Sequence, residues 1–264
     1  MHPMINIATR AARAGGDIIL RYVDRAGDVA ASEKQHNDFV SEVDHRAEEQ
    51  IIDVIRRAHP DHAILAEESG RQGNNEWEWI IDPLDGTTNF LHGFPHFAVA
   101  VAARYRGVLE HAVVFDPIRN ELFQASRGVG ALLDNRRIRV SPRRGLEGAV
   151  LATGFPFKHR DHTEAYFASF QAVFDKVADI RRAGSAVLDL AYVACGRVDG
   201  FWQLGLSTWD VAAGALLINE AGGVTTDFAG GDTHLETGQV VSGNLKLHAA
   251  ILDTVSPHLK GVGA

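Results

Sequence analysis

The segment WIIDPLDGTTNF, residues 79–90, constrains the fold more than any other part of this chain. Its apolar start predicts a short buried strand. Pro83 favours an extended conformation for Asp82 and removes a backbone donor, so the strand is expected to end there. Asp82 and Asp85 can then point towards one place, at the end of a buried strand. The segment therefore predicts a pair of carboxylates at a strand end.

The residues after these carboxylates are suited to binding an anion. Gly86 permits a tight turn with close approach of a ligand, and Thr87 and Thr88 can open a helix whose free N–H groups face a negative charge. Hard divalent cations such as Mg²⁺ take oxygen ligands and usually keep substrate phosphate and water in their shell. The pattern predicts a site for a divalent metal and a phosphate. The same residues also match an ordinary Asx-turn with a threonine as helix N-cap.

Two further segments carry acidic residues in comparable settings. In LAEESG, a short apolar strand ends in Glu67 and Glu68, just upstream of the aspartates. In LSTWDVAAGALLINEAGG, Ser207 matches a helix N-cap, and Asp210 lies in the first turn, where the helix macrodipole favours a carboxylate even without a metal. Taken alone, the glutamate pair also fits a solvated loop edge and Asp210 an ordinary helix start.

These segments, together with NDFVSEVD, which ends at Asp44, resemble the inositol monophosphatase family, and the resemblance covers nearly the whole chain. The family consists of Mg²⁺-dependent, lithium-sensitive phosphomonoesterases. The resemblance implies an α+β fold, a layered αβαβα sandwich of the inositol monophosphatase and fructose-1,6-bisphosphatase type. It also implies two or three Mg²⁺ ions per active site and a homodimer.

The resemblance also implies roles for particular residues. The ligands of the metals are Glu67, Asp82 and the Leu84 carbonyl for metal 1 and Asp82, Asp85 and Asp210 for metal 2. The residues that orient the attacking water are Thr87 and Asp44. The substrate-binding residues are Gly86, Thr87, Ala186, Gln203 and Asp210. From the residues alone, Asp44 is only the start of an amphipathic helix.

One departure from the family bears on the substrate. Members that act on inositol phosphates commonly have a glutamate seven residues before the aspartate of the second signature, and this chain has Gln203 there. An amide still hydrogen-bonds hydroxyls, but charge-assisted bonds are roughly twice as strong. Inositol 1-phosphate and related polyol monophosphates are the expected substrates. Fructose 1,6-bisphosphate or a 3′-phosphonucleotide is the alternative.

A second alternative is a binding role. The segments MHPMINIATRAARAGG and ILATGFPFK resemble the proteobacterial branch of the family, some members of which act with the transcription machinery in ribosomal RNA antitermination and processing. The resemblance thus implies RNA polymerase or an antitermination complex as a partner, although no motif in the sequence is typical of a polymerase contact.

Net charge and cysteine content limit the binding partners and the cellular compartment that fit this chain. The formal net charge of −8 and a pI near 5.9 argue against non-specific nucleic-acid binding and against a membrane surface, because both need a basic field. Cys195 is the only cysteine, so no intrachain disulfide is expected and a reducing compartment is favoured. The N-terminal segment has helical apolar spacing and no continuous apolar core, so no signal peptide is expected. A cytoplasmic location follows.

The order of elements predicts one compact unit with two halves and the active site between them. Residues 1–140 are expected to form an N-terminal α+β half with an antiparallel sheet and most of the metal ligands. Residues 141–264 are expected to form a C-terminal α/β half. The expected helices span residues 4–24, 42–58, 162–177, 185–195, 208–221 and 244–259. The expected strands include a hairpin over residues 97–115 and strands at 122–125, 131–133, 149–153 and 199–204.

Overall fold

The side chains of strand β6 (Ala98–Tyr105) explain how the layers stack in the computed structural model, which describes residues 2–29, 31–35, 38–157 and 160–259. Successive side chains of a strand point to opposite faces of the sheet. Val99, Val101 and Ala103 belong to one buried core. Ala98, Ala100 and Ala102 belong to another. The sheet is therefore apolar on both faces and needs helices on both.

Strand β6 lies within an eight-stranded sheet. The strand order is β10-β9-β8-β7-β6-β5-β3-β4, and the pairs are antiparallel except for the parallel pair β3–β5. The other strands are β3 (Ala63–Ala66), β4 (Gly70–Gln72), β5 (Trp77–Asp85), β7 (Val108–Asp116), β8 (Glu121–Ser126), β9 (Gly130–Leu133) and β10 (Arg136–Arg137). The predicted hairpin is confirmed as β6 and β7.

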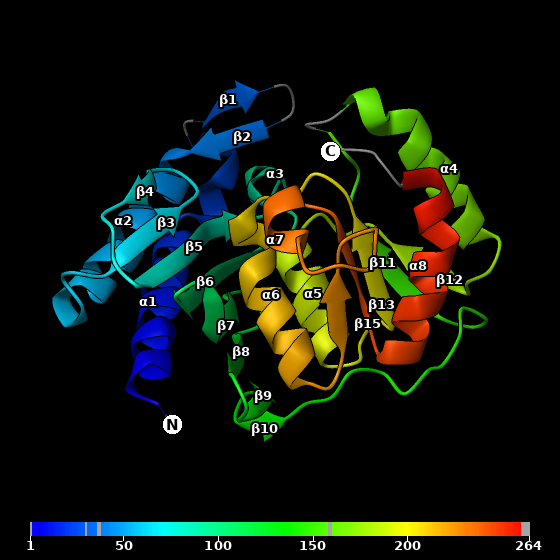
Figure 1. The fold of residues 1–264 in the computed structure, drawn as a ribbon. Coiled ribbons are helices and arrows are strands. Elements are labelled where there is room, and N and C mark those ends of the chain that lie inside the picture. Colours follow the sequence, from blue (N-terminus) through cyan, green and yellow to red (C-terminus); the bar gives the residue numbers. More distant parts are fainter. Residues whose placement is uncertain (1, 30, 36–37, 158–159, 260–264) are drawn as a thin grey trace.

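Two helices cover the outer face of this sheet (Figure 1). They are α1 (Pro3–Leu20) and α2 (Glu42–Ala58). The first helix was expected to reach residue 24, but its buried stripe ends at Ile19 and the chain continues as the 3-10 helix η1 (Val23–Asp28). A hairpin of β1 (Ala31–Gln35) and β2 (Asp38–Ser41), which the sequence did not predict, leads into α2.

The inner face of the large sheet packs on α5 (Ala186–Ala194) and α6 (Thr208–Glu220). Beyond them lies a second sheet with the strand order β12-β11-β13-β15-β14. Its strands are β11 (Val150–Thr153), β12 (Asp179–Arg181), β13 (Gly200–Gln203), β14 (Val224–Thr226) and β15 (Val240–Gly243). On this sheet Phe201 joins the core shared with α5 and α6, and its neighbour Trp202 joins the core on the opposite face.

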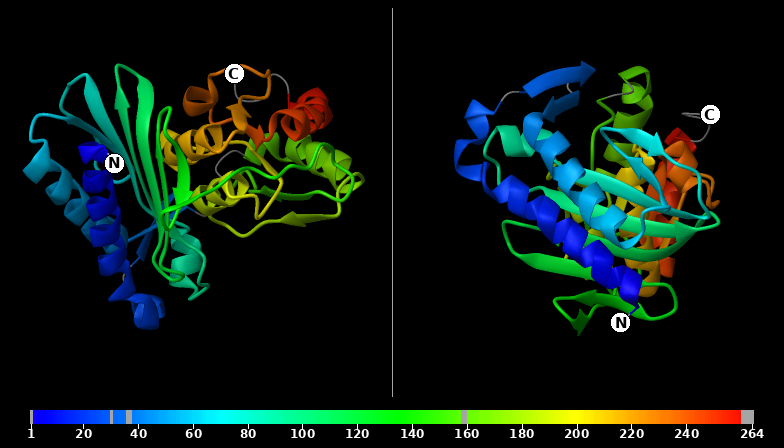
Figure 2. Two further views of the ribbon diagram at one scale, coloured as in Figure 1. Left: turned by 90° about the horizontal axis from the view of Figure 1, so that it is seen from below. Right: turned by 90° about the vertical axis from the view of Figure 1, so that its left-hand side faces the viewer.

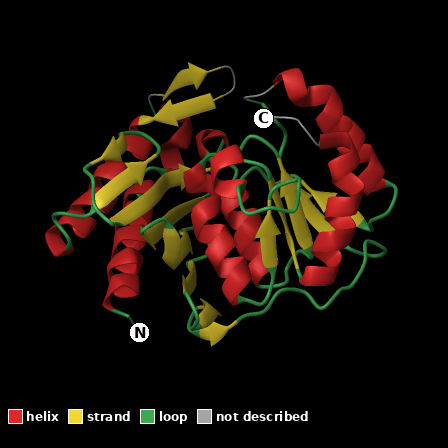
Figure 3. Ribbon diagram, in the orientation of Figure 1, coloured by secondary structure: helices red, strands yellow, loops and turns green. Residues whose placement is uncertain are grey.

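Helices α4 (Thr163–Phe174) and α8 (Leu245–Leu259) cover that opposite face. The described residues thus form five alternating layers, the expected αβαβα sandwich, which Figure 2 shows edge-on and Figure 3 shows as alternating helix and strand colours. Three short helices lie in the connections between these elements: α3 (Thr87–Leu91), η2 (Arg160–His162) and α7 (His234–Thr237). The helix expected at 162–177 ends at Phe174, and Asp175 caps it. None of the described helices is long and apolar enough to cross a membrane.

Strand β5 corrects one expectation about the motif. The strand was predicted to end at Asp82, because Pro83 follows, but it continues to Asp85. Asp82 is opposite Ala100 in β6, and Asp85 is opposite Ala98. An advance of three residues along β5 is therefore paired with an advance of two along β6, which is a β-bulge. Such a bulge accommodates a residue without an N–H donor while the ladder resumes beyond it. Pro83 therefore bends the strand instead of ending it.

Candidate active site

Helix α3 begins immediately after β5, as the motif predicted. Gly86 caps it with φ of 96°, in the left-handed region that glycine adopts without strain. An added Cβ at Gly86 would lie 3.0 Å from the carbonyl oxygen of His96, so a larger residue would also meet the backbone of the next segment. The chain can therefore turn sharply from the last carboxylate of β5 into Thr87.

Thr87 is hydrogen-bonded to Asp44, a residue 43 positions earlier in the chain. The Thr87 hydroxyl donates to Asp44 Oδ1 at 2.8 Å, with the Leu84 carbonyl oxygen as a further acceptor at 3.1 Å. The Asp44 Oδ2 atom accepts from the Ser41 N–H at 2.9 Å and from the Ser41 hydroxyl. Burial raises the pKa of Asp44, while the hydrogen bonds from Ser41 and Thr87 oppose that shift. Asp44 is thus both the start of α2 and a fixed partner of Thr87.

Three carboxylates lie together beside this pair. Oxygen atoms of Asp82, Asp85 and Asp210 all fall within 4.8 Å of one another, the only such group of His, Cys, Asp and Glu found among the described residues. Asp82 and Asp85 come from β5, and Asp210 comes from the first turn of α6, where Ser207 is the N-cap as predicted. The Ser207 N–H donates to Asp210 Oδ2 at 2.7 Å.

This group suits a divalent cation. Asp82 is only 1% exposed, and its pKa is raised well above the ordinary range, first by burial and then by repulsion from Glu67, Asp85 and Asp210. Its only lowering influence is the Leu84 N–H, which donates to Asp82 Oδ1 at 3.1 Å. A group of carboxylate oxygens held this close together matches the ligand preference of Mg²⁺.

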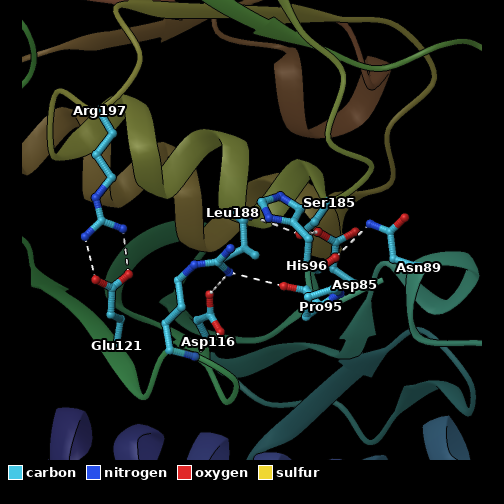
Figure 4. Close-up of polar contacts among 10 residues, drawn as sticks. Asp85, Asn89, Pro95, His96, Asp116, Glu121, Ser185, Leu188 and Arg197 are labelled. Carbon is cyan, nitrogen blue, oxygen red and sulfur yellow. Dashed lines mark hydrogen bonds and ion pairs between the residues drawn. The ribbon is translucent and has the colours of Figure 1, made fainter. Parts of the chain in front are cut away.

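Asp85 is fixed by helix α5, which lies in the layer opposite β5. The Ser185 hydroxyl donates to Asp85 Oδ2 at 2.5 Å (Figure 4). The Val187 N–H donates to the same atom at 2.8 Å. Asn89 adds a second link, because its amide donates to the carbonyl oxygens of His96 and Ala183 at 2.7 and 2.9 Å. The two layers are therefore tied together at the carboxylates.

All of these groups surround one cavity of about 560 Å³. Every predicted site residue except Asp44 lines it: Glu67, Asp82, Leu84, Asp85, Gly86, Thr87, Ala186, Gln203 and Asp210. Asp44 lies behind Thr87 and reaches the cavity through it. The structure thus brings the predicted residues together from β3, β5, α3, α5, β13 and α6.

Two further charged residues line the cavity: Asp189, which was not predicted, and Arg182, for which the sequence suggested support of a phosphate or a subunit contact. Asp189 of α5 is 3% exposed, and burial, followed by repulsion from Asp85, raises its pKa well above the ordinary range. The Arg182 guanidinium lies 5.0 Å from the ring centroid of Phe157 and 5.3 Å from that of Phe155. Asp189 is the only charged residue in the otherwise apolar and buried helix α5, and this isolated carboxylate is the sequence signal that could have identified it.

Comparison with known proteins agrees with this geometry. The model of the inositol monophosphatase family matches residues 1–260. The chain belongs to the inositol monophosphatase family. Among its relatives are the Nus factor SuhB of Pseudomonas aeruginosa, 54% identical over 98% of both chains, and that of Escherichia coli (strain K12), 52% identical over 98% of both chains.

Solved structures of the inositol monophosphatase family share the fold. The extragenic suppressor protein suhB of Bartonella henselae superposes with a TM-score of 0.92 at 41% identity, covering 99% of this chain and 100% of that one. The inositol monophosphatase of Anabaena gives a TM-score of 0.84 at 39% identity, with 97% and 94% coverage. The αβαβα sandwich and the resemblance to the proteobacterial SuhB branch are therefore confirmed.

The repulsion around Asp82 gives a testable stability effect. A raised pKa means that folded Asp82 keeps its proton where the unfolded residue loses it, so the metal-free protein should lose stability as the pH rises above about 4. Asp82→Asn should remove that loss and raise the melting temperature at pH 7, by about 2–4 °C for each kcal/mol of relieved repulsion. Thermal melts in a chelator at several pH values measure this. A variant that melts below the wild type at pH 7 would contradict the account.

Proposed function

We propose that this protein is a Mg²⁺-dependent phosphomonoesterase that hydrolyses inositol 1-phosphate and related polyol monophosphates to the alcohol and phosphate. The observation that supports it best is the grouping of Asp82, Asp85 and Asp210 within 4.8 Å, next to the hydrogen-bonded pair Thr87–Asp44. Membership of the inositol monophosphatase family supports phosphatase chemistry in general.

The acidic residues would hold two or three Mg²⁺ ions. The proposed ligands are Glu67, Asp82 and the Leu84 carbonyl for metal 1 and Asp82, Asp85 and Asp210 for metal 2. When bound, Mg²⁺ supplies Lewis-acid stabilisation of the charge on the phosphoryl and leaving oxygens and lowers the pKa of a coordinated water. Asp82, shared by both positions, is also the buried carboxylate whose pKa burial and the neighbouring carboxylates raise well above the ordinary range.

Thr87 and Asp44 would orient the attacking water. The Thr87 hydroxyl has one proton, and Asp44 Oδ1 accepts it at 2.8 Å, so the lone pairs on the threonine oxygen are directed to accept from a water. Asp44 is itself held by Ser41, which prevents the threonine from rotating freely. Holding a nucleophile in the reactive orientation lowers the barrier by reducing the entropy lost in the transition state.

The remaining residues would bind the substrate. The N–H groups of Gly86 and Thr87 lie in the first turn of α3, where backbone donors have no intrahelical acceptor, and would bind phosphate oxygens. Ala186, Gln203 and Asp210 would contact the alcohol. Gln203 packs closely on Gly154, where an added Cβ would come within 2.3 Å of its Oε1, so its amide is restrained in the cavity.

The names of the relatives favour a second function. Proteins called Nus factor SuhB are 54% and 52% identical to this chain over nearly its full length. We therefore also propose that the protein acts as a cytoplasmic homodimer and that it associates with the transcription antitermination machinery. Affinity capture of RNA polymerase by the tagged protein tests that association, with an unrelated acidic phosphatase as the control. Failure to enrich polymerase over this control would remove the second function.

The phosphatase proposal is tested with a panel of phosphate esters. The panel contains inositol 1-phosphate, glycerol 2-phosphate, fructose 1,6-bisphosphate and a 3′-phosphonucleotide, and released phosphate is measured with and without Mg²⁺. Turnover that requires Mg²⁺ and has its highest kcat/KM for the polyol monophosphates is expected. Preference for the bisphosphate or the nucleotide would reassign the substrate, and no release from any ester would end the proposal.

Thr87 and Thr88 provide a matched pair for testing the water. Thr87→Ala should lower kcat roughly 100-fold while changing KM little, because orientation of a nucleophile is expressed mainly in the transition state. Thr88 also lines the cavity, but its side chain has no comparable bond to Asp44. Thr88→Ala is therefore the control. Steady-state kinetics at saturating Mg²⁺ measure kcat and KM for both variants. Equal losses of kcat in the two variants would contradict the assignment of the Thr87 hydroxyl as the group that orients the water.

Gln203 tests the substrate class. If its amide contacts the polyol hydroxyls, Gln203→Glu should raise kcat/KM for inositol 1-phosphate relative to glycerol 2-phosphate, because a charge-assisted hydrogen bond replaces a neutral one. The gain should be on the order of 1 kcal/mol, about fivefold. Repulsion between the new carboxylate and the phosphate affects both esters and cancels in the ratio. An unchanged or reversed ratio would mean that residue 203 does not contact the alcohol.

A further inference from the structure

Helix α2 carries two buried carboxylates one turn apart. Asp44 is 0% exposed and Glu48 is 3% exposed. Side chains four residues apart lie on the same face of a helix. Asp44 faces Thr87 at the start of α3. The proposed mechanism does not use Glu48, although burying a carboxylate is costly unless its oxygens are hydrogen-bonded.

The partners of Glu48 are two consecutive backbone donors. The Glu68 N–H donates to Glu48 Oε2 at 2.8 Å, and the Ser69 N–H donates to Glu48 Oε1 at 2.9 Å. Both carboxylate oxygens are thus engaged by the turn that connects β3 and β4. Hydrogen bonds to a charged acceptor are stronger than neutral ones, so this contact fixes the turn firmly against α2.

The turn held by Glu48 begins with Glu67. The Glu67 N–H donates to the carbonyl oxygen of Ile81 in β5 at 3.2 Å, which ties Glu67 to the strand that carries Asp82. The Glu67 side chain lines the active-site cavity, and its charge acts on Asp82. Glu67 is therefore fixed on one side by β5 and on the other by Glu48, through the two residues that follow it.

We propose that Glu48 is a positioning residue for Glu67. By holding the Glu68 and Ser69 N–H groups, it keeps the Glu67 carboxylate directed into the cavity as a ligand of metal 1. The inference rests on the proposed function, because it needs Glu67 to bind Mg²⁺. Helix α2 then supports both parts of the chemistry, with Asp44 holding the hydroxyl that orients the water and Glu48 holding a metal ligand.

The test is Glu48→Gln, which keeps the shape of the side chain and creates no cavity. An amide has one acceptor oxygen, and its NH₂ group would face the second backbone N–H, so one of the two hydrogen bonds is lost. Mg²⁺ affinity, measured by calorimetry on the metal-free protein, should fall by about 10–100-fold, as for other residues that orient metal ligands. The Mg²⁺ concentration for half-maximal activity should rise in parallel, and kcat at saturating Mg²⁺ should stay within a few-fold of the wild type.

Glu49→Gln is the matched control, because it makes the same change at an exposed position on the same helix. It should leave Mg²⁺ affinity unchanged. A double-mutant comparison then separates positioning from general destabilisation: in a Glu67→Gln background, Glu48→Gln should cause no further loss of Mg²⁺ affinity. If Glu48→Gln does not fold, Glu48→Asp enters the same assays, because it keeps the charge but withdraws it from the turn, and the same weakening is expected.

The outcomes separate this inference from the proposed function. A wild-type protein that neither binds Mg²⁺ nor hydrolyses any ester would end the proposed function and the inference together. A wild-type protein that does both, alongside a Glu48 variant with unchanged Mg²⁺ affinity, would overturn the inference alone. Full additivity with Glu67→Gln would overturn it too, since Glu48 would then not act through Glu67.

Discussion

Repulsion among clustered carboxylates around the buried Asp82 is the constraint on which the site depends. Asp82 is almost fully buried on β5, and Glu67, Asp85 and Asp210 all disfavour its ionisation. Like charges at this separation stay together only if rigid elements hold them. A β-strand, the turn after its parallel neighbour and the first turn of a helix from another layer supply that rigidity. The layered fold can thus be understood as the frame that keeps these charges close.

Neutral donors from the described residues hold three of these carboxylates in place. Asp82 accepts from the Leu84 N–H, Asp210 from the Ser207 N–H, and Asp85 from the Val187 N–H and the Ser185 hydroxyl. Neutral donors fix an oxygen in place without cancelling its charge, whereas a lysine or arginine would neutralise it. These bonds therefore fix the carboxylate oxygens without themselves neutralising them. Glu48 is held in the same way, by two backbone N–H groups.

Two arginine–carboxylate pairs lie outside the lining of the active-site cavity. Arg197, which follows α5, makes a bidentate pair with Glu121 of β8, and Arg119 pairs with Asp116 at the end of β7 (Figure 4). The Glu121 pair raises the pKa of Arg197 and lowers that of Glu121. The Arg197–Glu121 pair links the segment after α5 to β8 of the large sheet, whereas the Arg119–Asp116 pair lies within the turn after β7, and neither pair includes a proposed metal ligand.

Local sequence predicted the elements with strong patterns. The periodic helices, the β6–β7 hairpin and the Ser207 cap followed from spacing, because each pattern lies within a few neighbouring residues. The strands β12, β14 and β15 were not predicted, since three or four residues carry too little periodicity. The path of β5 beyond Pro83 depends on a bulge against β6, which a single strand's sequence does not encode.

The candidate site likewise combines features that the local sequence predicts with features that depend on tertiary structure. The motif around Asp82 and Asp85 indicated a metal and phosphate site by itself, whereas pairing Thr87 with Asp44 required the family resemblance. The bond from Ser185 to Asp85 spans 100 residues and had no local signal. Glu48 is one more polar position on an amphipathic helix until the turn it holds is known. Such long-range contacts depend on tertiary structure, and local propensity does not report them.

Diffraction from crystals soaked in Mn²⁺, a scattering substitute for Mg²⁺, tests the central claim most directly. The account predicts at least two anomalous peaks in the cavity, each roughly 2 Å from its carboxylate oxygens, with Asp82 as a ligand to both. Asp85 and Asp210 should complete one of these positions and Glu67 the other. A cavity without anomalous density, or peaks that Asp82 does not contact, would contradict the idea that these carboxylates are held together to bind metal.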